Sequence, residues 1–167
     1  MIRNMATAEP KIDPCERLKE EHKVWKLHHP KGFSAEPRKD ENGVTNWLLW
    51  DCAIPGKSKT PWEGGLYKLK IKFSGNYPFE PPSCYFDPPI LHPNVFPSGT
   101  VSLSLLDRNK GWKPQITVKQ VLLGIQMLLN EPNFQQPAQA EAFALYAQSQ
   151  LTYEDKIKEQ ACLMAAK

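Results

Sequence analysis

The chain has 167 residues, of which 41% are hydrophobic and 23% charged, with a formal net charge of +3 at pH 7. This length suits one domain with a sizeable core, and the small net charge gives no sign of nucleic-acid binding. The longest apolar runs are too short to cross a membrane, and the first residues contain no apolar signal segment. We therefore expect a monomeric protein of the nucleus and cytoplasm that binds neither membranes nor nucleic acid.

The first part of the chain favours one helix followed by strands. Residues 1–12 are polar and are predicted to form a loose tail, ahead of a single domain over residues 13–167. The pair Asp13-Pro14 is a typical helix start, and Pro30 ends the apolar helical spacing that follows it. Apolar and alternating segments bounded by turn residues then predict four short strands, at residues 32–37, 46–54, 66–73 and 83–88.

The last part of the chain changes to helical spacing. A central core helix is predicted in the segment TVKQVLLGIQMLLNEP, because its apolar residues from Val118 to Leu129 form a wide stripe that Thr117 can cap and Asn130-Glu131-Pro132 stops. Two more helices are expected, at about residues 138–148 and 152–165. The predicted fold class is therefore α+β, a four-stranded antiparallel meander sheet with an N-terminal helix, a central core helix and two C-terminal helices on one face.

The cysteines and histidines give no metal-binding pattern. The four cysteines are scattered without a C-x-x-C pair, and His28-His29 has no partner at ligand spacing. We therefore expect reduced thiols, no metal site and no bound cofactor. Many of the sixteen prolines lie between Pro78 and Pro97, where they exclude regular sheet or helix. Because the same segment carries many apolar side chains, we expect an ordered and functional loop there.

The stretch LHPNVFPSGTVSLSLL, residues 91–106, has the form of a catalytic site. Asn94 in its His-Pro-Asn turn could donate its amide to an oxyanion, or could instead bind backbone groups of the loop. Ser102 occupies the place where a nucleophile is expected, but no base is placed to activate it and no serine-hydrolase motif surrounds it. Since a cysteine needs less activation than a serine, these surroundings suit a thiol better than a hydroxyl.

Five segments of the chain together resemble the ubiquitin-like-protein conjugating enzymes. They are IPGKSKTPWEGGLYKLKIKF, YPFEPPSCYF, LHPNVFPSGTVSLSLL, GWKPQITVKQVLLGIQMLLNEPN and QPAQAEAF, and the likeness covers about residues 14–165. The IPGKSKTPWEGG connector, the PAQAEA segment and the basic first helix are most similar to the SUMO-conjugating type. The resemblance implies a carrier function, in which an activating enzyme uses ATP to load SUMO onto the carrier and a substrate lysine then takes it.

The resemblance also implies roles for individual residues. The catalytic positions are the nucleophile position Ser102 and its neighbours His92, Asn94, Phe96 and Gln136. The positions that hold substrate are Ser98, Thr100, Asp107, Lys110, Pro137, Ala138 and Gln139. The positions that bind the activating enzyme and SUMO are His22, Lys23, Lys26 and His29. The expected partners are therefore SUMO, its activating enzyme, SUMO ligases and substrate proteins with acceptor lysines.

The chain departs from the SUMO-conjugating pattern at several positions. Ser102 stands where the family has cysteine, Phe96 where Tyr is usual and Gln136 where Asp is common. Ser83 and Tyr85 replace lysines that meet an acidic residue of the substrate. Three interpretations stay open. The chain is an enzyme whose nucleophile has been replaced by serine, which makes it transfer-deficient; or a natural silent variant that only binds SUMO or ubiquitin; or an enzyme for another modifier, such as ubiquitin.

Overall fold

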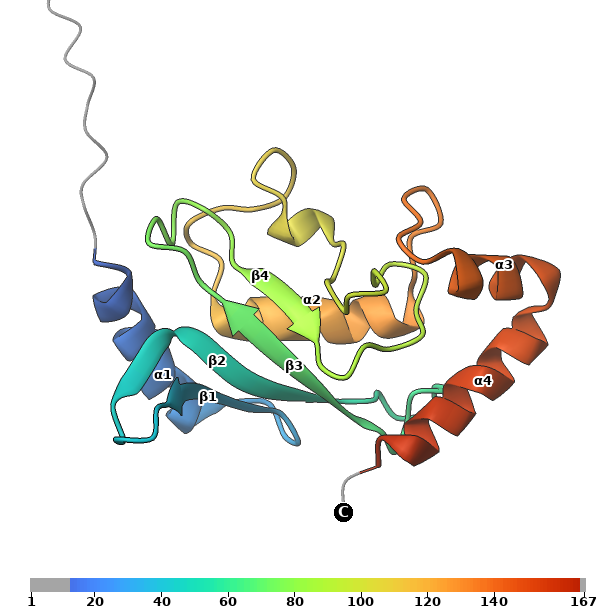
Figure 1. Ribbon diagram of the computed structural model, residues 1–167, viewed down its shortest axis with the longest axis horizontal. Helices are drawn as coiled ribbons and strands as arrows, with labels where there is room; N and C mark the ends of the chain where they lie inside the picture. Colours follow the sequence, from blue (N-terminus) through green and yellow to red (C-terminus); the bar gives the residue numbers. More distant parts are fainter. Residues whose placement is uncertain (1–12, 166–167) are drawn as a thin grey trace, which may run out of the picture.

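The computed structural model describes residues 13–165, and the predicted tail at residues 1–12 lies outside the described residues. One helix, four strands, a short 3-10 turn and three helices follow one another along the chain (Figure 1). Their bounds are α1 (Pro14–His28), β1 (Ser34–Lys39), β2 (Thr45–Pro55), β3 (Leu66–Lys72), β4 (Ser83–Phe86), η1 (Ser104–Leu106), α2 (Val118–Asn130), α3 (Ala140–Gln148) and α4 (Gln150–Leu163). None of the helices within residues 13–165 has both the length and the apolar character needed to cross a bilayer.

The four strands form one antiparallel sheet in the order β1-β2-β3-β4, which confirms the predicted meander. Cys52 of β2 lies opposite Ala35 of β1 and Leu69 of β3, and the register of β1 with β2 shifts between Pro37 and Arg38. β1 begins at Ser34, two residues later than predicted. Gly32 accounts for the difference, since it has a φ of +86° in the turn that precedes the strand.

The predicted core helix α2 packs its apolar stripe against the sheet. Leu122 and Ile125 are fully buried in the same core as Trp50, Ile54 and Ile71 of the strands. Figure 1 shows α2 lying across the sheet, α1 at one end, and α3 and α4 extending beyond the other end. The predicted layer of helices on one face is therefore correct for α2, whereas α3 and α4 lie beside the end of the sheet.

The proline-rich segment after β4 is ordered, as predicted, and folds back onto the sheet edge. Phe96 and Thr100 close a tight turn, in which the N–H of Phe96 donates to the carbonyl of Thr100 at 2.9 Å. Gly99 at the tip has a φ of +94°, and a Cβ there would lie 2.1 Å from the carbonyl oxygen of Phe86 on β4. Glycine is needed for this close approach, which fixes the chain that leads to Ser102.

Candidate functional site

His92 forms the buried base of the His-Pro-Asn turn. Its ring is fully buried, its Nε2 lies 2.8 Å from the carbonyl oxygen of Leu128, and its Nδ1 lies 2.9 Å from the backbone nitrogen of Asn94. The carbonyl can only accept and the N–H can only donate, so the ring is the neutral tautomer with its proton on Nε2. His92 therefore joins the turn to the end of α2, and neither ring nitrogen is free to exchange a proton with a substrate.

Asn94 connects two segments that are far apart in the sequence. Its Nδ2 donates to the carbonyls of Asn133 at 2.7 Å and Gln136 at 3.1 Å, and its Oδ1 accepts from the N–H of Asn133 at 2.7 Å. Its own backbone carbonyl accepts from the N–H of Ser102 at 2.8 Å. Both amide hydrogens of Asn94 are thus occupied by the loop. Of the two roles considered for this side chain, the geometry supports the ordering of the loop.

Ser102 is half-buried and lines a depression of about 210 Å³. The lining residues are Asn94, Ser102, Leu103, Ser104, Gly124, Met127, Leu128, Glu131, Asn133 and Gln136. Glu131 is the one ionisable side chain in this lining, and no histidine or lysine is among the lining residues. The depression therefore presents a hydroxyl at the nucleophile position without a histidine base beside it. This agrees with the sequence-based argument against a serine hydrolase.

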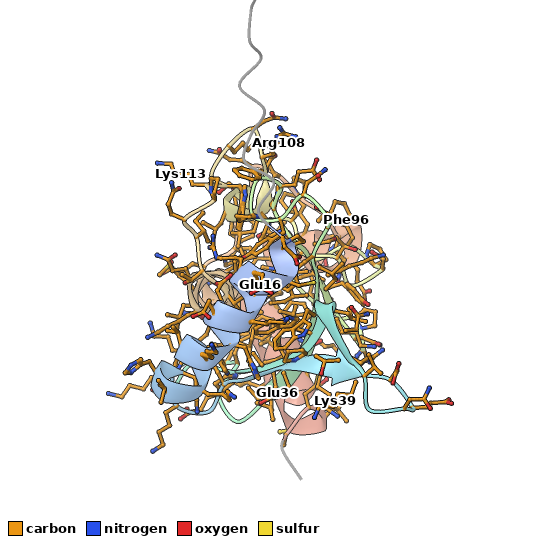
Figure 2. All side chains as sticks on the ribbon, turned by 90° about the vertical axis from the view of Figure 1, so that its left-hand side faces the viewer. Glu16, Glu36, Lys39, Phe96, Arg108 and Lys113 are labelled. Carbon is orange, nitrogen blue, oxygen red and sulfur yellow. The ribbon has the colours of Figure 1, made fainter. Side chains whose placement is uncertain are left out.

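The remaining predicted catalytic positions lie at different places. Gln136 is exposed and lines the depression, so the structure brings it together with Ser102 and Asn94. Phe96 is 43% exposed on the turn after the His-Pro-Asn motif and is not part of the lining. Figure 2 shows Phe96 on a different side of the molecule from α1. Gln136 and Phe96 therefore stand on two separate loops, and of the two only Gln136 is among the residues that line the depression with Ser102.

The predicted substrate positions divide into surface residues and one buried residue. Ser98 and Thr100 stand on the turn with their hydroxyls 3.0 Å apart, and Asp107 pairs loosely with Lys110 at 3.9 Å after η1. Gln139, in contrast, is buried at 9% exposure. Its Nε2 donates to the carbonyls of two residues that flank the His-Pro-Asn turn, Ile90 and Val95, at 3.0 Å each. Gln139 supports the turn from inside, so it cannot contact a substrate.

Pro137 and Ala138 lie between the depression and α3. Pro137 is exposed and Ala138 is half-buried, and the N–H of Ala138 donates to the carbonyl of Pro93 at 2.7 Å. Two substitutions noted in the sequence lie on β4, where Ser83 is exposed and Tyr85 half-buried beside Thr100. The surface around the site is therefore built from β4, the turn at residues 96–100 and the loop at 133–138.

The predicted partner-binding residues lie along α1, away from Ser102. Lys23 and Lys26 are exposed, and Lys23 pairs with Glu20 of the same helix at 3.1 Å. His29 stacks on the Trp25 ring with a centroid distance of 5.6 Å. His22 is more enclosed, since its ring packs edge-on against Trp47 and Trp50 and its Nε2 lies 3.0 Å from a carboxylate oxygen of Glu36. Figure 2 shows α1 running along the side of the molecule that faces the viewer. Lys23 and Lys26 of α1 and His29 directly after it are exposed to solvent.

Some residues that build the site were not identified from the sequence. Glu131 and Met127 line the depression. From the sequence, Glu131 was predicted only to be part of the segment that ends the core helix. Asn133 binds both polar atoms of the Asn94 amide through its own backbone, for which no side-chain pattern exists. Among residues 13–165, no group of three or more histidine, cysteine, aspartate or glutamate side chains is placed to hold a metal ion.

We predict that His92 makes the fold sensitive to acid. Burial lowers the pKa of His92 from 6.5 to about 4, so between these pH values the unfolded chain binds a proton that the folded chain does not. The contribution to stability is complete above about pH 6.5 and falls by about 3 kcal/mol as the pH drops toward 4. Urea unfolding at pH 7 and pH 4.5 checks this, with a His92→Gln variant as the control that cannot titrate. Equal losses in the two chains would contradict the prediction, as would NMR signals of a charged His92 ring at pH 5.5.

The chain matches known proteins over most of its length. The family model described as "Ubiquitin-conjugating enzyme" matches residues 17–161. "SUMO-conjugating enzyme UBC9" of Caenorhabditis elegans is 54% identical over 150 residues, which is 90% of this chain and 90% of that protein. "SUMO-conjugating enzyme SCE1" of Arabidopsis thaliana and "Sumo-conjugating enzyme ubc9" of Dictyostelium discoideum are each 48% identical over 145 residues, or 87% of this chain and 91% of theirs. With its His-Pro-Asn turn folded beneath residue 102, the chain belongs to the ubiquitin-conjugating enzyme family.

Proposed function

We propose that this chain is a SUMO-conjugating transferase that accepts SUMO from the SUMO-activating enzyme at residue 102 and passes it to substrate lysines. The observation that carries the proposal is the position of Ser102. It lies in the depression next to Asn94, and its backbone N–H donates to the carbonyl of Asn94 at 2.8 Å. The choice of SUMO is supported by the printed names of three relatives that are 48–54% identical over most of the chain.

The proposed chemistry is two acyl transfers. In the first, the Ser102 oxygen attacks the carbonyl carbon of the thioester between SUMO and a cysteine of the activating enzyme. The carbon–sulfur bond breaks, the cysteine leaves as a thiolate, and the hydroxyl proton passes to solvent. In the second, a substrate lysine amine attacks the resulting ester, the carbon–oxygen bond breaks, and the Ser102 oxygen recovers a proton from the amine.

Serine makes both steps slow. The hydroxyl is a weak nucleophile without a base, and no histidine or lysine lines the depression to supply one. In the second step the leaving alkoxide is much more basic than a thiolate, so the ester resists attack by amines. We therefore propose that the chain with Ser102 is transfer-deficient, and that a cysteine at this position would give an active carrier.

A second candidate function is a SUMO- or ubiquitin-binding module that performs no transfer. It is favoured by the combined changes at three positions of the family site, Phe96, Ser102 and Gln136. In this case the exposed surface of α1 and of His29 directly after it, with Lys23 and Lys26, would provide the binding.

For the transferase, SUMO ligases and substrate proteins with acceptor lysines are further proposed partners. The location in nucleus and cytoplasm and the absence of a bound cofactor stay predictions.

The test is a charging reaction with SUMO-activating enzyme, ATP and SUMO, analysed on gels with and without reductant. The Ser102→Cys form is expected to gain a SUMO adduct that reductant removes. The unchanged chain is expected to give no adduct, or a weak one that resists reductant. Ser104→Cys is the matched control, because it places a thiol in the same depression two residues away and is expected not to be charged.

The outcomes separate the candidate functions. If Ser102→Cys forms no adduct with SUMO but forms one with ubiquitin and the ubiquitin-activating enzyme, the proposed modifier is wrong. If it forms an adduct with neither, the transferase proposal fails and the binding module remains. Binding of free SUMO to the unchanged chain, measured by calorimetry, then tests that second function directly.

A further inference from the structure

A row of aromatic rings connects the loop beside Ser102 to the two C-terminal helices. Phe134, in the loop between α2 and α3, has its ring centroid 4.3 Å from that of Tyr146 on α3, at an interplanar angle of 34°. Tyr146 in turn meets Tyr153 of α4 edge-on, with centroids 5.1 Å apart. We call these three residues the aromatic row. Because Tyr153 is only 5% exposed, the row is fixed at its far end in the core of the α3–α4 pair.

The near end of the aromatic row lies inside the segment that Asn94 holds. Asn133, directly before Phe134, exchanges two backbone hydrogen bonds with the Asn94 amide. Gln136, two residues after Phe134, accepts the third through its carbonyl. Phe134 therefore lies in the chain between two residues whose backbones bind the Asn94 side chain. A displacement of Phe134 is expected to displace these backbone groups with it.

Beyond residue 137, the loop is held by Ala138, whose N–H donates to the carbonyl of Pro93 at 2.7 Å, and by the side chain of Gln139. Residues 132–137 of the described chain have fewer such bonds. Pro132 and Pro137 at its two ends have no backbone N–H to donate. The N–H of Gln135 donates to Asn133 within the same loop, so this bond does not connect the loop to the rest of the molecule. Within residues 132–137, the ring of Phe134 is therefore a side-chain anchor on α3, through Tyr146 and through Phe143 at 6.2 Å.

We propose that Phe134 is a positioning residue of the site at Ser102. Its contact with Tyr146 fixes the loop at 133–136, and through Asn94 that loop fixes the depression in which the carrier bond is made and broken. A displacement of α3 and α4 would in this way displace the loop at 133–136 and the depression at Ser102. The effect on the loop follows from the contacts alone, whereas its effect on transfer to lysine rests on the proposed function.

The first test does not depend on activity. In the unchanged chain, the N–H of Ser102 and the side-chain amide of Asn94 are bound and should exchange slowly with solvent, as measured by NMR hydrogen exchange. Phe134→Ala is expected to accelerate the exchange of both groups at least tenfold. Phe134→Tyr, which keeps the ring, is expected to stay within about twofold of the unchanged chain.

A matched control removes the same side chain elsewhere. Phe79 is also partly buried, but it lies in the segment between β3 and β4, outside the lining of the depression. Phe79→Ala is expected to leave the exchange at Ser102 and Asn94 within twofold, even if it lowers global stability. If Phe79→Ala and Phe134→Ala accelerate these two groups equally, or if Phe134→Ala accelerates neither, the proposal is overturned.

The second test uses the Ser102→Cys carrier. Charging with SUMO is expected to slow when Phe134→Ala is added, because the carrier bond is made in the same depression, so discharge is followed from adduct that has already formed. Discharge of the adduct to free lysine is expected to fall about tenfold or more, because small displacements in a site cost large factors in rate. If the carrier is not charged at all, the proposed function fails, and the exchange experiment alone decides the role of Phe134. A Phe134→Ala carrier that discharges at the normal rate contradicts the proposed effect on transfer.

Discussion

Replacing Asn94 with alanine is expected to lower the free energy of unfolding by about 2–4 kcal/mol, because three partly buried hydrogen bonds disappear together. The substitution leaves the N–H and carbonyl of Asn133 and the carbonyl of Gln136 without their partner. Chemical denaturation measures the loss. Asn109→Ala is the control: it removes the same amide from an exposed turn and should change stability by no more than about 0.5 kcal/mol.

The Asn94→Ala variant also separates the two roles considered for this side chain. If Asn94 acts by ordering the loop, its loss and that of Phe134 remove the same support, so their effects on lysine discharge in the Ser102→Cys carrier should not add. If the Asn94 amide instead stabilises the oxyanion directly, the two losses should multiply. We expect the non-additive result, because both amide hydrogens of Asn94 are already bound to loop carbonyls. A multiplicative result would restore the oxyanion role.

The sequence predicted those parts of the fold that local patterns determine. Asp13 caps α1 by accepting from the N–H of Cys15, and Thr117 caps α2 by accepting from the N–H of Gln120. The alternation in β3 and the apolar stripe of α2 likewise appear as the buried faces of these elements. The predicted first residue of an element was wrong by two residues where a turn or a cap lay next to the hydrophobic pattern. α4, for example, begins at Gln150 because Ser149 caps it, earlier than the predicted residue 152.

The site was predicted less completely, because contacts between distant segments decide its details. Ser102, Asn94 and Gln136, which the resemblance to the conjugating enzymes puts at one site, line the same depression. The burial of Gln139 could not be foreseen, because it depends on two carbonyls 44 and 49 residues away in the chain. The same applies to Glu21, which looks in the sequence like one more charge on an amphipathic helix.

Glu21 joins three parts of the molecule through one carboxylate. Its Oε1 accepts from the N–H of Val118 at the start of α2, at 2.7 Å. Its Oε2 accepts from the Tyr77 hydroxyl and from Nε of Arg17, the latter at 3.2 Å. Arg17 continues the network to the backbone carbonyls of Pro114 and Ile116 before α2. A negative charge at the N-terminus of α2 also suits the helix dipole, so this contact anchors the core helix to α1.

Replacing Glu21 with alanine is therefore expected to destabilise the protein by about 3–5 kcal/mol. The Glu21 side chain is only 9% exposed, so solvent cannot fully replace it. Its loss leaves the N–H of Val118 and the hydroxyl of Tyr77 without an acceptor. Burial, with the nearby Glu21 carboxylate as the second cause, raises the pKa of Tyr77, so this hydroxyl stays a donor throughout the physiological pH range. Denaturant unfolding followed by tryptophan fluorescence measures the effect.

Two further variants show whether the network or the charge of α1 is responsible. Glu21→Gln keeps an oxygen that can accept from Val118 but loses the ion pair with Arg17, so an intermediate loss is expected. Glu20→Ala removes a neighbouring glutamate that is 71% exposed and that, within residues 13–165, pairs with Lys23, and should cost less than about 1 kcal/mol. If Glu20→Ala and Glu21→Ala lose the same stability, the net charge of α1 determines the outcome. A large difference between these neighbours can arise only from the buried bonds that Glu21 makes to Val118, Tyr77 and Arg17.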